Sequence, residues 1–162
     1  MTNMRRGFTM IELIFVIVII GILAAVAIPK LAATRDDAEA STCVHEVGQL
    51  IQEMSATYTK LGNADYTTAA IEDVTNITTN ITGGQNGTKG INEVGTTVLS
   101  SGTTITYVCD GESIVTLTGT NAGTDFNLSV AVTTAGTTPA SAQAEEDILK
   151  NIGGTSPKIY SL

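Results

Sequence analysis

A single carboxylate, that of Glu12, lies inside an apolar run that otherwise extends from Phe8 to Pro29. A carboxylate within hydrocarbon costs roughly 2.5–3.5 kcal/mol, so such a residue persists where it pairs with another group or serves a function. A glutamate that reaches toward the membrane surface from near the helix end is the simpler alternative. The chemistry to be explained is therefore the neutralisation of a charge in apolar surroundings.

Cys43 and Cys109 are the only cysteines in the chain, and His45 is its only histidine. Cys43 and His45 are two positions apart, and residues with that spacing point to different faces of a helix, so we do not expect a nucleophilic pair. The two cysteines form either one disulfide or two free buried thiols. The compartment in which they reside decides between these states.

Motifs for other chemistry are missing from the sequence. It has no phosphate-binding glycine loop, no zinc-ligand spacing and no nucleophile elbow. Its scattered acidic residues lack the ordered spacing of a calcium loop. We therefore expect no active site, no metal and no cofactor, and the protein is not expected to be an enzyme.

The apolar run is long enough to cross a bilayer. From Phe8 to Pro29 it has about 22 residues, against the ~20 needed to cross ~30 Å of hydrocarbon. The run is apolar on every side, so its helix must lie in lipid or against copies of itself. Arg5 and Arg6 precede it, so the positive-inside rule leaves that end in the cytoplasm and exports the chain after Lys30. A signal peptide has a shorter apolar core, and an uncleaved membrane anchor is the simpler alternative.

The segment RRGFTMIELIFVIVIIGILAAVAIP resembles the amino terminus of type IV prepilins and type II secretion pseudopilins, which share a prokaryotic N-terminal methylation motif. Gly7 precedes Phe8, Glu12 is the fifth residue counted from Phe8, and Pro29 lies near the end of the apolar helix. The resemblance covers about residues 5–34, a fifth of the chain.

This resemblance implies a processing site. A prepilin peptidase would cleave between Gly7 and Phe8 and methylate the new amino group of Phe8. Residues 1–7 would be the leader peptide, and residues 8–29 would be the half of a long helix that spans the membrane and later forms the filament core.

The resemblance also gives Glu12 a partner. Its carboxylate would pair with the free amino group of Phe8, in the same or a neighbouring subunit, and so set the register of assembly. Pro29 would bend or loosen the helix as it enters the filament, because proline removes a backbone hydrogen bond. A helix that simply ends at Pro29 is the alternative.

Residues 30–162 are expected to form an exported globular domain with the pilin fold, an α+β fold in which a long N-terminal helix packs on a small antiparallel sheet. The helical period, with apolar residues three and four positions apart, continues to about Leu61. Gly62 and Asn63 then supply a stop signal. The following segment reads as a loop with room for a short helix over residues 69–77.

Three later segments alternate apolar and polar residues and predict strands over 103–109, 113–119 and 126–132. Asp110 and Gly111 predict a hairpin turn between the first two. An antiparallel sheet of three or four strands, laid on the second half of the long helix, accounts for all three. Residues 139–153 predict a short terminal helix that begins near Pro139 and ends at Gly153.

Charge and compartment complete the sequence-based expectations. The formal charge of −8 becomes about −10 once Arg5 and Arg6 leave with the leader, which disfavours direct binding of nucleic acid. Both cysteines fall in the exported part, where disulfides persist, and the strand ending at Cys109 is expected to cover the helix that carries Cys43. A bridge between them is favoured, although many pilins bridge within their carboxy-terminal region.

The resemblance implies a structural subunit that a cytoplasmic ATPase and an inner-membrane platform protein polymerise into a helical homo-oligomer. Before assembly the chain would cross the bacterial inner membrane once, with its N-terminus in the cytoplasm; afterwards it would lie in a surface pilus or a periplasmic pseudopilus. The major pseudopilin family has a tryptophan-containing motif that this chain lacks, since it has no tryptophan. A type IV pilus subunit is therefore favoured over a type II secretion pseudopilin. An uncleaved membrane-anchored exported domain is the alternative of another class.

Overall fold

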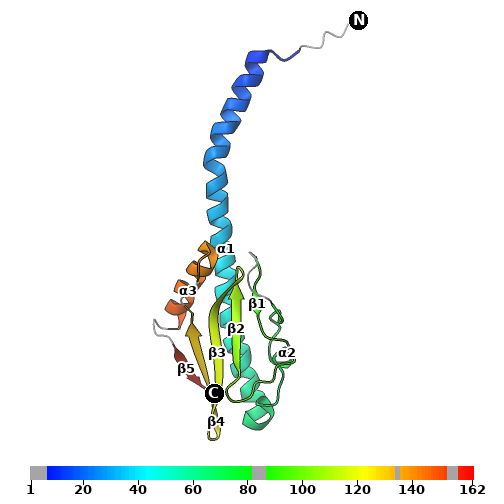
Figure 1. The fold of residues 1–162 in the computed structure, drawn as a ribbon, viewed down its shortest axis with the longest axis vertical. Coiled ribbons are helices and arrows are strands. Elements are labelled where there is room, and N and C mark those ends of the chain that lie inside the picture. The colour runs from blue at the N-terminus through cyan, green and yellow to red at the C-terminus, as the bar shows by residue number, and fades with distance from the viewer. Residues whose placement is uncertain (1–6, 82–86, 134–135, 153–156) are drawn as a thin grey trace, which may run out of the picture. The chain divides into compact units, whose positions relative to one another are not determined.

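The computed structural model describes residues 7–81, 87–133, 136–152 and 157–162. Its elements are α1 (Met10–Tyr66), α2 (Ile71–Val74), β1 (Gly90–Ile91), β2 (Thr104–Cys109), β3 (Glu112–Ala122), β4 (Asp125–Val132), α3 (Pro139–Asn151) and β5 (Lys158–Ser161) (Figure 1). The chain divides into two compact units, Met1–Arg35 and Asp36–Leu162. Of the predicted leader, all but Gly7 lies outside the described residues.

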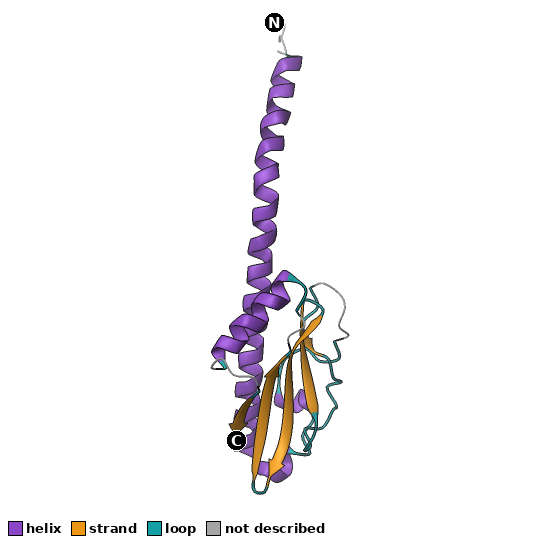
Figure 2. Cartoon of the chain, turned by 60° about the vertical axis from the view of Figure 1, so that its left-hand side comes forward, coloured by secondary structure: helices purple, strands orange, loops and turns teal. Residues whose placement is uncertain are grey.

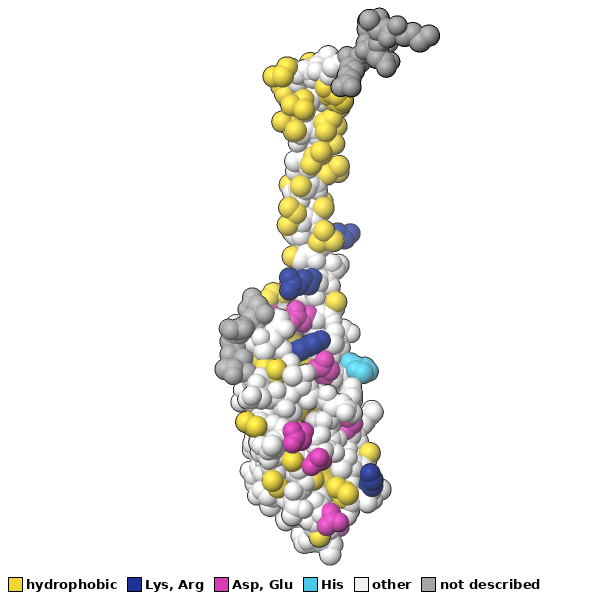
Figure 3. All heavy atoms as spheres, turned by 90° about the vertical axis from the view of Figure 1, so that its right-hand side faces the viewer, with side chains coloured by type: hydrophobic (Ala, Val, Ile, Leu, Met, Phe, Trp, Pro, Cys, Tyr) yellow, Lys and Arg dark blue, Asp and Glu magenta, His cyan; other side chains and the backbone are white. Residues whose placement is uncertain are grey.

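The first unit is an apolar helical segment with no buried side chain among its described residues. Ile11 is 76% exposed and Val26 is 69% exposed. Hydrophobic side chains cover this part of α1 in the space-filling view (Figure 3), and α1 contains a window long and apolar enough to cross a membrane. Its helical backbone continues through Pro29. The alternative in which the helix ends at Pro29 is therefore wrong.

The only non-helical backbone inside α1 is at Gly62, with φ 74° and ψ 168°. A positive φ is the left-handed region, which glycine adopts without a steric penalty from a Cβ. The break coincides with the predicted stop signal. One more helical turn follows it, so α1 extends to Tyr66 rather than to about Leu61.

The second unit contains a five-stranded antiparallel sheet in the order β1-β2-β3-β4-β5. The three predicted strands correspond to β2, β3 and β4, and the predicted turn joins β2 to β3 with φ of 49° at Asp110 and 81° at Gly111. Two positive φ values match the turn type that suits the twist of a hairpin. The expectation of three or four strands is too low, because β1 and β5 have only two and four residues and show no alternating pattern.

One face of the sheet packs against α3 and the 36–66 part of α1, which both lie on the same side of the strands (Figure 2). The core is made of large apolar side chains from all of these elements. Its fully buried members include Leu50, Met54, Tyr66, Ile105, Leu117, Phe126, Leu128 and Ile148. Burial of each such side chain contributes about 1.5–3 kcal/mol, so this face holds the unit together.

An aromatic cluster fills the core where β3 and β4 approach the end of α1. The ring of Tyr66 lies edge-on to Phe126 at 5.1 Å and to Tyr58 at 5.3 Å between centroids. Phe126 also covers Gly119 of β3, where an added Cβ would lie 2.2 Å from the ring. Any side chain at Gly119 would therefore displace the ring.

A disulfide joins Cys43 of α1 to Cys109 at the end of β2. Both cysteines are fully buried. The bond closes a loop of 66 residues and ties the helix directly to the sheet that covers it. The sequence-based preference for a bridge over two free thiols is thus confirmed.

The carboxylate of Glu112, in the first residue of β3, fixes the start of α3. It accepts hydrogen bonds from the Ser141 hydroxyl at 2.6 Å and from the Thr138 N–H at 3.2 Å, and from the N–H and hydroxyl of Thr137. The Thr138 hydroxyl caps the helix by accepting from the Ser141 N–H. These bonds, first from Ser141 and then from Thr137, lower the pKa of Glu112 to about 2. The predicted helix end at Gly153 lies outside the described residues.

Replacing both cysteines, Cys43→Ser with Cys109→Ser, is expected to lower the free energy of unfolding of the second unit by about 3–4 kcal/mol, because a loop of this length is no longer closed in the unfolded state. The measurement is denaturant unfolding of the full chain in mild detergent. Reduction of the wild type by a dithiol should give the same loss. A change below about 1 kcal/mol would show that the bridge adds little.

Glu112→Gln is expected to destabilise the second unit by about 1–2 kcal/mol above pH 5, because one amide oxygen cannot accept all the bonds that the carboxylate accepts. Since the pKa of Glu112 falls on folding, its contribution is present above about pH 4.5 and is lost as the pH falls toward 2. Unfolding of wild type and variant should therefore converge near pH 2. Glu72→Gln, at an exposed position, is the control, and a difference that stays constant with pH would contradict the role of Glu112.

Candidate assembly site

The first turn of α1 contains a reciprocal capping pair. Thr9 immediately precedes the helix, and its N–H and hydroxyl donate to Oε2 of Glu12 at 2.8 and 2.6 Å. In return the N–H of Glu12 donates to the Thr9 hydroxyl oxygen at 3.3 Å. This is the capping box, in which a threonine and a glutamate three positions later satisfy backbone donors that the helix end leaves unpaired.

This pair gives Glu12 a local role that sequence reasoning missed. The threonine-x-x-glutamate spacing of Thr9 and Glu12 is a readable signature of a helix start, so the signal was present in the sequence. The bonds hold the carboxylate at the N-terminal end of α1, where the helix dipole favours negative charge. A carboxylate at the helix start therefore costs less than one placed in the middle of an apolar helix.

Gly7 and Phe8 lie just before this turn, in exposed chain outside the helix. Phe8 is 78% exposed, and nothing lies within 4 Å of the position that a Cβ on Gly7 would occupy. Both residues of the peptide bond between them are therefore exposed. In the uncleaved chain the nitrogen of Phe8 belongs to that peptide bond, so its pairing with Glu12 stays a prediction about the processed chain.

The remaining sequence-predicted residues lie elsewhere. Pro29 is 17 positions beyond Glu12 on the helix, roughly 25 Å at 1.5 Å per residue, so it does not belong to this site. Cys43 and Cys109 are buried in the second unit. The candidate site therefore consists of four residues near the start of α1: Gly7, Phe8, Thr9 and Glu12.

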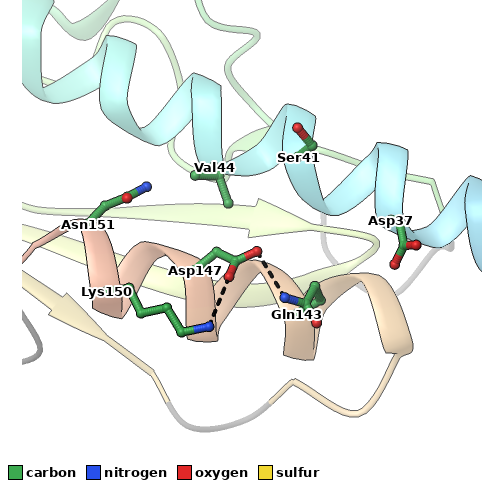
Figure 4. A pocket seen from close by; sticks show the side chains of 7 residues that line it. All are labelled: Asp37, Ser41, Val44, Gln143, Asp147, Lys150 and Asn151. Atoms are coloured by element: carbon green, nitrogen blue, oxygen red, sulfur yellow. Dashed lines mark hydrogen bonds and ion pairs between the residues drawn. The ribbon is translucent and has the colours of Figure 1, made fainter.

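The second unit has a shallow hollow between α1 and α3, in which Asp37 and Ser41 face Gln143, Asp147 and Lys150 (Figure 4). Three of its polar groups are already paired with one another on α3, because Asp147 accepts from Gln143 at 2.9 Å and from Lys150 at 3.4 Å. Within the described ranges no three His, Cys, Asp or Glu residues are grouped so as to hold a metal ion. Neither feature assigns a catalytic role to this unit.

Comparison with known proteins places the amino-terminal site in a family context. The family model of the prokaryotic N-terminal methylation motif matches residues 2–28. Over 67 residues the chain is 37% identical to type II secretion system core protein G of Escherichia coli (strain K12), which covers 41% of this chain and 45% of that protein. Over 50 residues it is 44% identical to type IV major fimbrial protein FimA of Dichelobacter nodosus, which covers 31% and 32%.

These matches cover only part of each relative. Each spans less than half of the length of the relative that it concerns, and no solved structure matches the chain. The amino-terminal segment matches the prokaryotic N-terminal methylation motif, and the long helix packed on an antiparallel sheet is consistent with an α+β pilin fold. Motif, relatives and fold together support a pilin or pseudopilin, without deciding between the two.

Thr9→Val is expected to loosen the first turn of α1, because it removes the hydroxyl that both donates to and accepts from Glu12. Loss of an N-cap costs about 1 kcal/mol, equivalent to about five-fold faster hydrogen exchange of the first-turn amides. The measurement is hydrogen exchange of the full chain in detergent micelles. Thr9→Ser keeps the hydroxyl and should exchange as the wild type does; equal rates in all three chains would rule out the capping role.

Proposed function

We propose that the protein is a structural subunit of a type IV pilus, made as a prepilin and polymerised through α1. The observation that carries this proposal is the Glu12 carboxylate in the first turn of an apolar helical segment without buried side chains, just after Gly7 and Phe8. A plain membrane anchor needs an apolar helix but not this arrangement at its start. The methylation-motif match over residues 2–28 supports the same conclusion.

Processing follows from the open segment before the helix. We infer that a prepilin peptidase cleaves between Gly7 and Phe8 and methylates the new amino group. Removal of residues 1–7 then turns the nitrogen of Phe8 into a cation four positions before Glu12. The carboxylate, already held by Thr9, is placed to pair with such an amine.

Assembly takes place through the apolar surface of residues 8–29. In the membrane this surface is covered by lipid, and in a filament it is covered by the same surface of other copies. Small residues such as Gly21, Ala24 and Ala25 allow helices to approach closely, which favours packing of identical helices. Each Glu12 in such a bundle pairs with the amine of its own or a neighbouring Phe8, so neither charge remains alone in apolar surroundings.

The remaining partners and places follow from this mechanism. Before assembly the subunit spans the inner membrane once, with its N-terminus in the cytoplasm, and residues 30–162 are exported. A membrane platform protein and a cytoplasmic ATPase supply the work of extraction. The exported domain then forms the filament surface, and no enzymatic activity is part of the proposal.

The second candidate is a type II secretion pseudopilin. The similarity to type II secretion system core protein G favours it, since that match is longer than the match to the fimbrial protein. The absence of tryptophan from this chain, against the tryptophan-containing motif expected of the major pseudopilin family, favours the pilus. The two candidates share the same processing. They differ in whether the filament extends from the cell surface, as a pilus does, or stays in the periplasm, as a pseudopilus does.

Glu12→Gln is the direct test. The variant chain should be cut and methylated normally. Its amount in filaments sheared from the cell surface should be at least ten-fold lower than that of the wild type, because the amine of Phe8 is then left without its counter-charge. Glu146→Gln, the same chemical change on the exposed face of α3, should assemble as the wild type does. Equal assembly of both variants would contradict the proposed role of Glu12. Wild-type chain that is processed but stays in the cell envelope would favour the pseudopilin.

A further inference from the structure

A second hollow in the second unit lies between α1 and the chain that joins α2 to β1, which is green in Figure 1. Its volume is about 210 Å³, and it shares no lining residue with the hollow of Figure 4. The proposed function uses none of its side chains. All but one of them are polar, and the set consists of Glu46, Gln49, Asn76, Ile77, Thr78 and Lys89.

The carboxylate of Glu46 is held in place by the core. Tyr107, fully buried in β2, donates from its hydroxyl to Oε2 of Glu46 at 2.7 Å. Burial, and then the Glu46 carboxylate, raise the pKa of Tyr107, so the phenol keeps its proton and stays a donor at neutral pH. The other oxygen of Glu46, Oε1, lies 3.5 Å from Nζ of Lys89. The side chains of Glu46 and Lys89 are 24% and 37% exposed, so a ligand can reach both charged groups.

A second carboxylate, that of Glu53, fixes two further lining residues. It accepts from the side-chain amide of Gln49 at 2.8 Å and from the backbone N–H of Asn76 at 3.4 Å. The backbone of Thr78 is fixed as well, because its carbonyl accepts from the N–H of Ile91 at 2.8 Å. The lining groups are therefore ordered before any ligand binds, which lowers the entropy cost of binding.

Several of these ordered groups still have hydrogen-bonding capacity. The amide nitrogen of Gln49 donates to Glu53, which leaves the side-chain oxygen of Gln49 as an acceptor. The hydroxyl of Thr78, on an exposed side chain, has no hydrogen-bond partner among the described residues. The ammonium group of Lys89 has three donors, and the ion pair with Glu46 occupies one side of it. The hollow thus offers donors and acceptors close together.

The charge of the lining favours a neutral ligand. Glu46 and Lys89 are its two charged residues and have opposite signs, so the hollow has no net charge with which to attract an ion. A hydroxyl both donates and accepts, so adjacent hydroxyls can donate to Glu46 and accept from Lys89 without separating the ion pair. A sugar ring carries several such hydroxyls. It also has C–H groups that can contact the apolar side chain of Ile77.

We propose that this hollow, the Glu46–Lys89 site, binds one neutral sugar residue, the terminal hexose of a glycan. Its volume is below the ~300–1,000 Å³ of pockets that enclose drug-sized ligands, so it suits a single ring. The exposed residues Asn76 and Thr78 leave the ring open to the rest of the glycan. The site belongs to the second unit alone and does not rest on the proposed function. In a filament it would be repeated in every subunit, and weak binding would gain avidity.

Binding is tested by NMR titration of the isotope-labelled full chain in micelles of a phosphocholine detergent, which has no sugar headgroup. The probes are the methyl glycosides of glucose, galactose and mannose. At least one should bind with a Kd on the order of millimolar, with shifts concentrated at the residues of the Glu46–Lys89 site. Binding of none of the three, or shifts confined to the hollow between α1 and α3, would overturn the proposal.

Two further probes test the chemistry of the ligand. The free hexoses lack the linkage that the methyl glycosides share with a glycan. Binding of free hexoses without binding of the glycosides would therefore contradict the assignment to a glycan. Tighter binding of the matching uronate would show that Lys89 attracts an anion, and it would likewise overturn the neutral ligand.

Variants place the ligand at this hollow. Lys89→Met keeps the length of the side chain but removes its donors, and it should weaken binding roughly ten-fold. Thr78→Val keeps the shape and removes the hydroxyl, so it should also weaken binding. Lys60→Met, the same change at an exposed position of α1 outside the hollow, should bind as the wild type does.

Stability and assembly are kept separate from binding. A partly exposed ion pair contributes little to folding, so Lys89→Met should unfold at the same denaturant concentration as the wild type. If it does not, Thr78→Val alone decides the outcome. Wild-type affinity in the variants that fold would contradict the site. The measurement uses unassembled chain, so its result stands whether or not the chain forms filaments.

Discussion

An α-helix that is apolar on every face must be covered by something other than water, and this constraint governs the first unit of the protein. None of the described side chains from Gly7 to Arg35 is buried within the chain itself. Under the proposed function, lipid would satisfy the constraint before assembly, and parallel copies of the same helix would satisfy it afterwards. Because lipid and protein both offer apolar contact, the hydrophobic effect does not separate these two states. Charges have to select the assembled one, which is why the few polar groups of this segment matter.

The second unit meets a different requirement, that of holding a small domain together. Its small core is reinforced on either side of the turn between β2 and β3, where a disulfide and a hydrogen-bonded carboxylate each attach a helix to the sheet. The Cys43–Cys109 disulfide fixes the helix, and the Glu112 carboxylate fixes the start of α3. Both attachments are independent of the apolar segment. Under the proposed function, the unit would therefore keep its structure while the segment before it exchanges lipid for protein.

Sequence reasoning reached the parts of the structure that local patterns encode. The apolar run, the helix break at Gly62 and the β2–β3 hairpin all follow from residues adjacent in sequence. It missed β1 and β5, because strands of two and four residues are defined by their partners and not by their own pattern. The roles of Thr9 and Glu112 were missed for different reasons. The capping signature of Thr9 and Glu12 is present in the sequence but was overlooked within the apolar run. Glu112 binds residues at least 25 positions away in the sequence, which no local pattern indicates.

The central claim is that this chain is cut before Phe8 and works as a polymer of the processed form. The most direct test is the intact mass of the chain in filaments sheared from native cells and prepared without reductant. The account predicts a mass equal to residues 8–162 with one added methyl group and two hydrogens fewer for the disulfide. Filaments that contain none of this chain, together with a chain in the membrane that still begins at Met1, would contradict it.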